Sequence, residues 1–206
     1  MINFLKTEEQ HQHKNGGGWV ANTATVSETA YVGPNAWVSG NARVSDNARV
    51  YDNAWVSGDA WVSGNALVYG DAWVYDNALV SGNARVSDNA LVSDDARVSG
   101  NARVSGNALV YDNALVSGDA RVSGDAWVSG DAWETSPLYI QGSKHALTNS
   151  AYGFLNIGCI KLSFSEWKKQ YKKVGKAQGY TPAQIKEYGL LIAFATKVGK
   201  KVKHGN

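Results

Sequence analysis

The side chains that could do acid–base chemistry are few in this sequence, and they lie outside its most regular part. Four histidines and one cysteine are present, and none of them falls between Asn22 and Trp133. Histidine is the usual general base near neutral pH, so a catalytic base would have to come from the flanking segments. The one histidine outside the expected flexible ends is His145, within Gly142-Ser143-Lys144-His145. It is the one candidate catalytic residue, although its sequence favours an ordinary histidine in a surface turn.

Neither a metal nor a cofactor is expected. The single cysteine, Cys159, cannot form an internal disulfide, and its apolar neighbours predict a buried, unreactive thiol. His11, His13 and His204 lie near the two ends, in segments that we expect to be flexible. No Cys/His group has the spacing of a zinc site.

A six-residue repeat determines where the side chains between residues 22 and 134 point. Alanine stands at every sixth position from Ala24 to Ala132, and valine follows two positions later from Val26 to Val128. The unit is A-x-V-[SY]-[GD]-[ND]. In an extended strand alternate side chains point to opposite faces, so alanine and valine share the inner face and x points outward. The last two positions favour a turn, because their residues tolerate left-handed backbone. Each hexad therefore predicts one short strand and one corner.

This unit resembles the hexapeptide-repeat family, and the resemblance covers residues 22–134, about half of the chain. The family implies a left-handed parallel β-helix in which three hexads form one triangular coil. About six coils at roughly 4.8 Å each would give a column on the order of 30 Å tall. The expected fold class is mainly β, with a small C-terminal α+β cap.

The segments that flank the repeats carry a second resemblance. Gly16-Gly17-Gly18-Trp19-Val20 before them, and Leu155-Asn156-Ile157-Gly158-Cys159 with Ser165-Glu166-Trp167 after them, are similar to hexapeptide-repeat proteins commonly encoded by bacteriophages. This resemblance implies a phage or prophage origin and no particular activity.

Both ends of the column need caps, because open strand edges promote aggregation. Residues 1–21 are the expected N-terminal cap, with Phe4, Leu5 and Trp19 as candidate plugs, and residues 135–206 are the C-terminal cap. In the second cap, Ser163 with Glu166 and Thr181 with Pro182 predict two helix starts. The apolar run 189–195 is interpreted as the buried face of the second helix.

Charge divides along the chain. Residues 22–133 carry six Arg against twelve Asp and one Glu, a net charge of −7, whereas residues 134–206 carry twelve Lys against three Glu, a net charge of +9. The lysines alternate with a helical core face, which favours a solvated cap surface over a nucleic-acid site. No apolar run is long enough for a membrane span or a secretory signal, so we expect a cytoplasmic protein, in a bacterial host cell if it is phage-encoded.

The variable position x decides what each face of the column displays. The first face carries an apolar ladder of Trp37, Trp55, Trp73, Leu91, Leu109 and Trp127. The second carries Tyr31, Arg49, Leu67, Arg85, Arg103 and Arg121. The third carries Thr25, Arg43, Trp61, Leu79, Arg97, Leu115 and Trp133.

The apolar ladder predicts an oligomer interface. One Trp covers about 150–250 Å², so the ladder exceeds the roughly 300–600 Å² apolar patch that a monomer usually exposes. The family resemblance implies a homotrimer with its columns side by side, and we expect the ladder to lie in that contact. In the alternative interpretation the stacked rings only stiffen an exposed sheet.

The arginines of the second face predict a site for a small anionic ligand such as a nucleotide. The candidate ligand-binding residues are Arg49, Arg85, Arg103, Arg121 and Tyr31. Arginines stacked about 4.8 Å apart repel one another unless something neutralises them. The structural alternative is neutralisation by corner acids such as Asp88 and Asp125.

The sequence thus predicts a non-catalytic, oligomeric binding or structural module, whose partner is a small anion or a host protein. An acyltransferase-like enzyme is the alternative that the family resemblance implies, with a histidine as the base. The repeats favour the first interpretation, because they contain no histidine and no extruded loop that could wall a substrate pocket.

Overall fold

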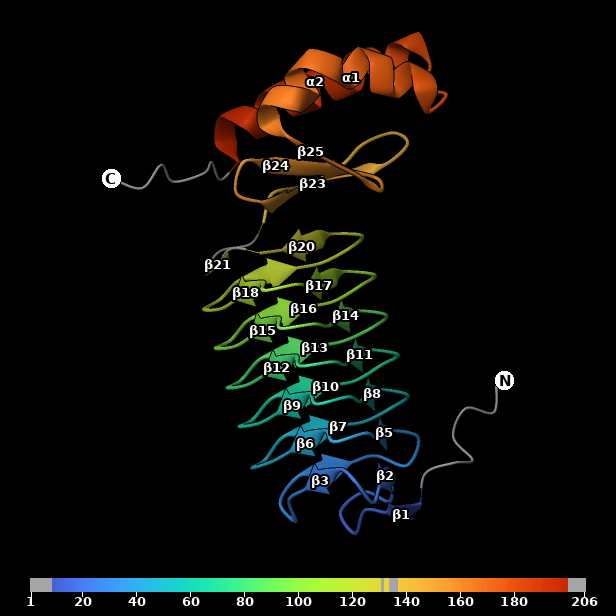
Figure 1. Ribbon diagram of the computed structural model, residues 1–206, viewed down its shortest axis with the longest axis vertical. Coiled ribbons are helices and arrows are strands. Elements are labelled where there is room, and N and C mark those ends of the chain that lie inside the picture. The colour runs from blue at the N-terminus through green and yellow to red at the C-terminus, as the bar shows by residue number, and fades with distance from the viewer. Residues whose placement is uncertain (1–8, 131, 134–136, 200–206) are drawn as a thin grey trace.

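The computed structural model describes residues 9–130, 132–133 and 137–199 as a column of stacked coils with an α+β cap at one end (Figure 1). The strands of the column form three sheets, within which successive coils pair in parallel. Strands three apart in the chain are neighbours, so three hexads make one coil, as the repeat predicted. This arrangement confirms a β-solenoid of about six turns.

The three sheets have the following members. The first contains β2 (Trp19–Ala21), β5 (Trp37–Val38), β8 (Trp55–Val56), β11 (Trp73–Val74), β14 (Leu91–Val92), β17 (Leu109–Tyr111) and β20 (Trp127–Ser129), with β1 (Gln10–Gln12) antiparallel at its edge. The second contains β4 (Tyr31–Val32), β7 (Arg49–Val50), β10 (Leu67–Val68), β13 (Arg85–Val86), β16 (Arg103–Val104) and β19 (Arg121–Val122). The third contains β3 (Thr25–Val26), β6 (Arg43–Val44), β9 (Trp61–Val62), β12 (Leu79–Val80), β15 (Arg97–Val98), β18 (Leu115–Val116) and β21 (Ala132–Trp133).

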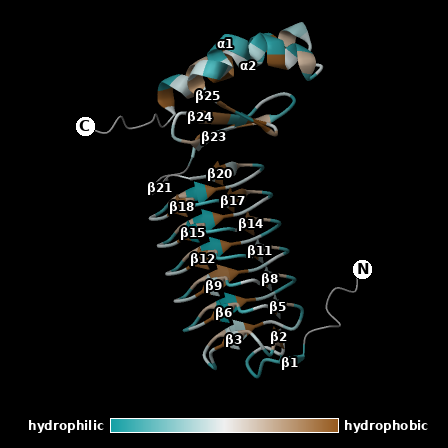
Figure 2. Ribbon diagram, in the orientation of Figure 1, coloured by the Kyte–Doolittle hydropathy of each residue, from teal (hydrophilic) through white to brown (hydrophobic). Residues whose placement is uncertain are grey.

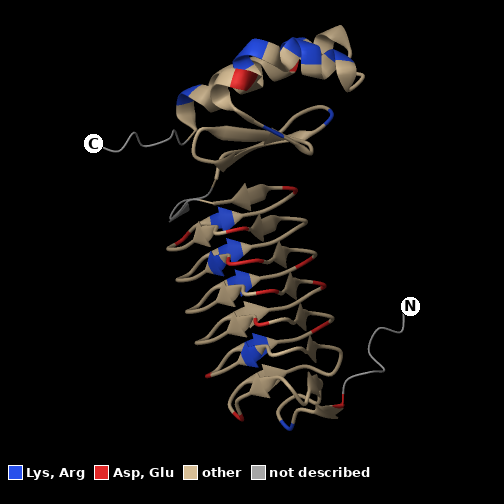
Figure 3. Ribbon diagram, in the orientation of Figure 1, with Lys and Arg blue, Asp and Glu red and all other residues tan. Residues whose placement is uncertain are grey.

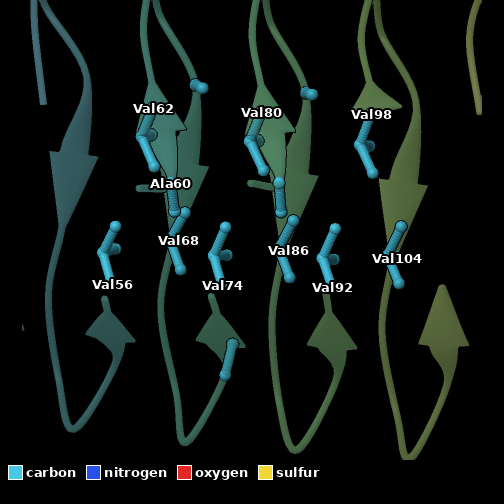
Figure 4. Close-up of a cluster of buried hydrophobic side chains, with 14 of the residues drawn as sticks. Val56, Ala60, Val62, Val68, Val74, Val80, Val86, Val92, Val98 and Val104 are labelled. Carbon is cyan, nitrogen blue, oxygen red and sulfur yellow. The ribbon is translucent and has the colours of Figure 1, made fainter. Parts of the chain in front are cut away.

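Alanine and valine fill the inside of the column. From Ala30 to Val128 the side chains of this series are 0–1% exposed. Figure 4 shows the valines of successive coils in line inside the column. Each coil is tied to the next through the backbone: the amide of Trp37 donates to the carbonyl of Ala54 (3.0 Å). Since the residues between Ala and Val point outward, the outer faces are free to vary.

The corners explain the Gly/Asp position of the repeat. From Gly40 to Gly130 this position has positive φ throughout, and an aspartate there can accept a hydrogen bond from the next coil. One example is Asp46, whose carboxylate accepts the amide of Gly64 at 2.9 Å. The following Asn/Asp position adds a second contact between coils, as when the amide of Asn53 donates to Asp71 at 2.9 Å. Figure 2 shows hydrophilic and hydrophobic residues alternating on the strands of the column.

The regular register ends at the last rung. We expected Trp133 to stack on Leu115, but Leu115 pairs with Ala132, and Val116 pairs with Trp133. A slip of one residue exchanges inner and outer positions. In this hexad Glu134 stands at the position that valine holds in every earlier hexad.

The parallel ladder starts earlier than residue 22, because β2 already pairs with β5 in register. Trp19 is therefore a rung of the first sheet and not a plug; Phe4 and Leu5 lie outside the described residues.

The N-terminal strand β1 forms a hairpin with β2, and His13, which follows β1, is buried with 7% exposure. Burial, with a smaller contribution from His11, lowers the pKa of His13 below its usual range. The expectation of flexible N-terminal histidines was thus wrong for this pair, and His204 lies outside the described residues.

The C-terminal cap is an antiparallel sheet covered by two helices. The sheet consists of β22 (Tyr139–Gln141), β23 (Ala146–Ala151), β24 (Phe154–Ile157) and β25 (Ile160–Ser163), and the helices are α1 (Phe164–Ala177) and α2 (Pro182–Val198). Figure 1 shows the sheet between the column and the helices. The ammonium group of Lys161 donates to the hydroxyl of Ser129 in the last coil (2.6 Å), and Tyr139 packs on the solenoid core. Both helices begin with the predicted residues, each within a complete capping box.

The interpretation of residues 189–195 as a buried face was wrong. Leu190 is 67% exposed and Phe194 is 51% exposed, whereas Ile192 and Ala195 are buried. The run lies on one helix, whose consecutive residues point to different sides, and only one side meets α1 and the sheet. In the part of the chain that the structure describes, no helix combines the length and the apolar character that a membrane crossing requires.

Candidate functional site

The outer side of the first sheet carries the predicted apolar ladder, extended by one rung. The ladder face consists of Trp19, Trp37, Trp55, Trp73, Leu91, Leu109 and Trp127, which pair in register from coil to coil. The rings of Trp19 and Trp37 stack with centroids 5.7 Å apart, and those of Trp55 and Trp73 meet edge to face at 5.2 Å. The indole N–H of Trp55 donates to the hydroxyl of Ser39 in the preceding coil (3.0 Å). The ladder is therefore an ordered apolar surface.

Two tyrosines shape this face in a way that the sequence did not reveal. Tyr75 and Tyr111 follow the inward valines and lie beside the ladder, where they help to line two hollows. The smaller hollow, of about 300 Å³, is lined by Trp55, Ser57, Trp73, Tyr75 and Leu91. The larger, of about 380 Å³, is lined by Tyr75, Leu91, Ser93, Asp94, Leu109, Val110, Tyr111 and Trp127. The signal in the sequence is the Ser/Tyr position of the repeat, where tyrosine follows the inward valine at Tyr75 and Tyr111.

The second sheet displays the predicted arginines, but they are not equivalent. The guanidinium of Arg49 lies 4.9 Å from the ring centre of Tyr31 and 5.5 Å from that of Tyr51. Tyr51 in turn stacks on Tyr69, with ring centres 5.0 Å apart. Cation–π contacts of this kind stabilise a positive charge. Arg49 and Tyr31 therefore already have partners within the protein.

Arg85, Arg103 and Arg121 pair in register on adjacent strands and are exposed. Figure 3 shows basic residues on the strands of the column and acidic residues along its corners. Between residues 9 and 130 no ion pair joins Arg85 or Arg103 to an acid. The carboxylate of Asp88 instead accepts the amide of Gly106 (3.0 Å).

Asp125 is likewise engaged within its corner, where it accepts the side-chain amide of Asn107 (2.9 Å). Neutralisation of Arg85 and Arg103 by these two acids is thus not observed. The physical reason is that a corner carboxylate meets donors of the neighbouring coil in its own corner before it can reach across a face.

His145 and Cys159 lie in the cap, where they line a hollow of about 380 Å³ together with Trp127, the last rung of the ladder face. Ile157 pairs with Ile160, so Gly158 and Cys159 form the tight turn between β24 and β25, and the thiol is exposed. The prediction of a buried thiol in a strand was wrong, because Gly158 adopts a φ of 57° and turns the chain there. Among the described residues no cluster of three or more His, Cys, Asp or Glu could hold a metal ion.

Comparison with known proteins agrees with this architecture. The family model described as the YdcK beta solenoid repeat matches overlapping segments that together span residues 42–130. No curated protein and no solved structure matches the chain. Together with the three parallel sheets, this match shows that the chain is a β-solenoid repeat protein, whose repeats are similar to those of the YdcK solenoid.

Proposed function

We propose that the chain is a non-catalytic structural and binding module that assembles through its ladder face. The observation that carries this proposal is the unbroken apolar ladder of seven rungs, with Tyr75 and Tyr111 beside it. Trp73 is 46% exposed and the other four indoles are partly buried, so only a part of the roughly 150–250 Å² of each Trp is open to a partner. A stable interface needs about 800 Å² per partner, so it would have to include the neighbouring corners with Tyr75 and Tyr111.

The proposed assembly is a homotrimer in which the ladders of three copies face one axis parallel to the columns. Each rung then meets the same rung of the other copies, and the indoles fill the space around the axis. Left-handed winding, a phage or prophage origin and a bacterial cytoplasm as the location are parts of the same proposal. They are supported by the resemblance of the repeats and their flanks to hexapeptide-repeat proteins.

The substitution Trp73→Glu is expected to convert the trimer to a monomer at micromolar concentration, because it places three unpaired carboxylates in an apolar contact. Light scattering coupled to size-exclusion chromatography measures this change. Trp61→Glu is a matched control, since Trp61 and Trp73 are each 46% exposed but lie on different sheets. A monomeric wild-type chain, or dissociation by Trp61→Glu and not by Trp73→Glu, contradicts the proposal.

The second part of the proposal is that Arg85, Arg103 and Arg121 hold a small anionic ligand, with Arg49 and Tyr31 beside them. Support comes from the exposed, in-register arginines, of which Arg85 and Arg103 have no carboxylate partner between residues 9 and 130. Arginine binds phosphate and carboxylate groups through paired N–H donors. A nucleotide would also find aromatic rings nearby, in Tyr31 and Tyr51.

Inorganic phosphate and ADP are expected to raise the Tm of the wild-type chain, and Arg103→Ala is expected to reduce that rise. An anion at one hundred times its Kd stabilises the folded state by about 2.7 kcal/mol, which corresponds to several degrees in a chain of this length. Arg43→Ala is the control, because Arg43 is also exposed but lies on the third sheet. The anion site is rejected if neither probe shifts the Tm, or if both variants lose the shift equally.

A further inference from the structure

A cavity of about 130 Å³ lies inside the cap, between its sheet and its two helices. Its apolar walls are Ile157, Ile160, Trp167, Tyr171, Val174, Ile185 and Ile192. Trp167 and Ile192 are buried, whereas Cys159, which also lines the cavity, is exposed. The cavity therefore runs from an opening at the β24–β25 turn to a closed, apolar inner end.

The polar groups at the inner end are already satisfied by the protein. The indole N–H of Trp167 donates to the carbonyl of Leu155 (2.8 Å). Near the opening, the hydroxyl of Tyr188 accepts the amide of Lys144 (3.1 Å) and donates to the carbonyl of His145 (2.5 Å), so it too is satisfied. The inner end thus offers only hydrocarbon and aromatic surface, and an apolar cavity of such a size stays dry and takes an apolar guest.

His145 and Tyr180 lie at the opening. The hydroxyl of Tyr180 is hydrogen-bonded to that of Tyr188, which leaves its oxygen able to accept one further hydrogen bond. His145 lies beside Tyr180, with ring centres 5.9 Å apart, and neither ring nitrogen of His145 has a hydrogen-bond partner among the described residues. Burial raises the pKa of Tyr180 to about 12, so its hydroxyl keeps its proton at neutral pH. One end of the cavity is therefore apolar, and the other presents both a donor and an acceptor.

We infer that this cavity binds one small planar ring, an aromatic or heteroaromatic group of about the size of benzene, with a polar substituent that points to His145 and Tyr180. A cavity of about 150 Å³ is known to hold benzene, so the volume fits one ring and excludes fused ring systems. The edges and faces of Trp167, Tyr171 and Tyr180 give the ring aromatic neighbours. Apolar pockets with a few converging polar groups are the usual form of small-molecule sites. The inference is independent of the function proposed for the solenoid faces.

The test is titration of the full chain with phenol and with benzene, followed by NMR shifts of the aromatic side chains. Phenol is expected to bind with a Kd of about 1 mM or tighter, and about 5- to 10-fold more tightly than benzene, because its hydroxyl gains one hydrogen bond. Val174→Phe places a ring in the cavity and is expected to weaken both ligands at least tenfold. Leu190→Phe, on the exposed side of α2, is the control and leaves both affinities unchanged.

A second variant keeps the inference testable if Val174→Phe does not fold. Tyr180→Phe preserves the shape of the wall and removes one of the two polar groups, so it is expected to lower the affinity for phenol toward that for benzene and to leave benzene unaffected. No binding of either ligand to the folded wild-type chain overturns the inference. So does unchanged binding by a folded Val174→Phe variant, or an equal affinity for both ligands that Tyr180→Phe does not alter.

Discussion

The substitution Val86→Asp is expected to destabilise the solenoid by about 3–5 kcal/mol or more, which is most of the 5–15 kcal/mol that keeps a typical domain folded. Val86 is fully buried and pairs with Val68 and Val104 in the neighbouring coils. A carboxylate at this place would lose its water and find only alanine and valine around it. Urea denaturation followed by circular dichroism measures the loss.

The neighbouring residue supplies the control. Arg85 precedes Val86 in the same strand, but its side chain is exposed and lies beside Arg103. Arg85→Asp is expected to change the free energy of unfolding by less than about 0.5 kcal/mol, as surface substitutions usually do. Equal destabilisation by the two variants would mean that the assignment of inner and outer positions is mistaken.

The second large effect is expected at a corner. Gly100 has a φ of 68°, and a Cβ atom at this position would lie 3.0 Å from the amide nitrogen of Gly118 in the next coil. Valine is branched at Cβ and strongly disfavours this backbone region, so Gly100→Val is expected to cost about 2–3 kcal/mol. Thermal and urea denaturation measure the cost.

The matched variant is Gly100→Asp. Aspartate occupies the same corner column at Asp46, with a φ of 59°, and its carboxylate accepts the amide of Gly64. The same contact is available between an aspartate at residue 100 and the amide of Gly118, so we expect a loss of less than about 1 kcal/mol. If aspartate and valine destabilise equally, the hydrogen bond between corners does not compensate for the left-handed backbone.

Much of the candidate site followed from the repeat. The six rungs from Trp37 to Trp127 and the register of Arg85 with Arg103 were predictable, because residues 18 positions apart pair by construction. The hollows beside the ladder were not predicted, because they depend on which corners carry Tyr75 and Tyr111 instead of serine. The hydrogen-bond partner of each charged side chain was not predicted either. Asp88 accepts the amide of Gly106 and does not pair with an arginine, because its short side chain reaches the neighbouring corner first.

The sequence by itself determined the column: strand, corner, inner face and outer face recur within six residues, so each local choice agrees with its copies above and below. The tertiary structure decided the conformation of the segments that follow the last repeat. The slip of Ala132 onto Leu115, the exposed turn at Cys159 and the outward side of α2 at Phe194 all depend on elements that meet only once. The cap cavity belongs to this second group, because His145 and Tyr180 are brought together by a sheet and two helices that pack without a repeating pattern.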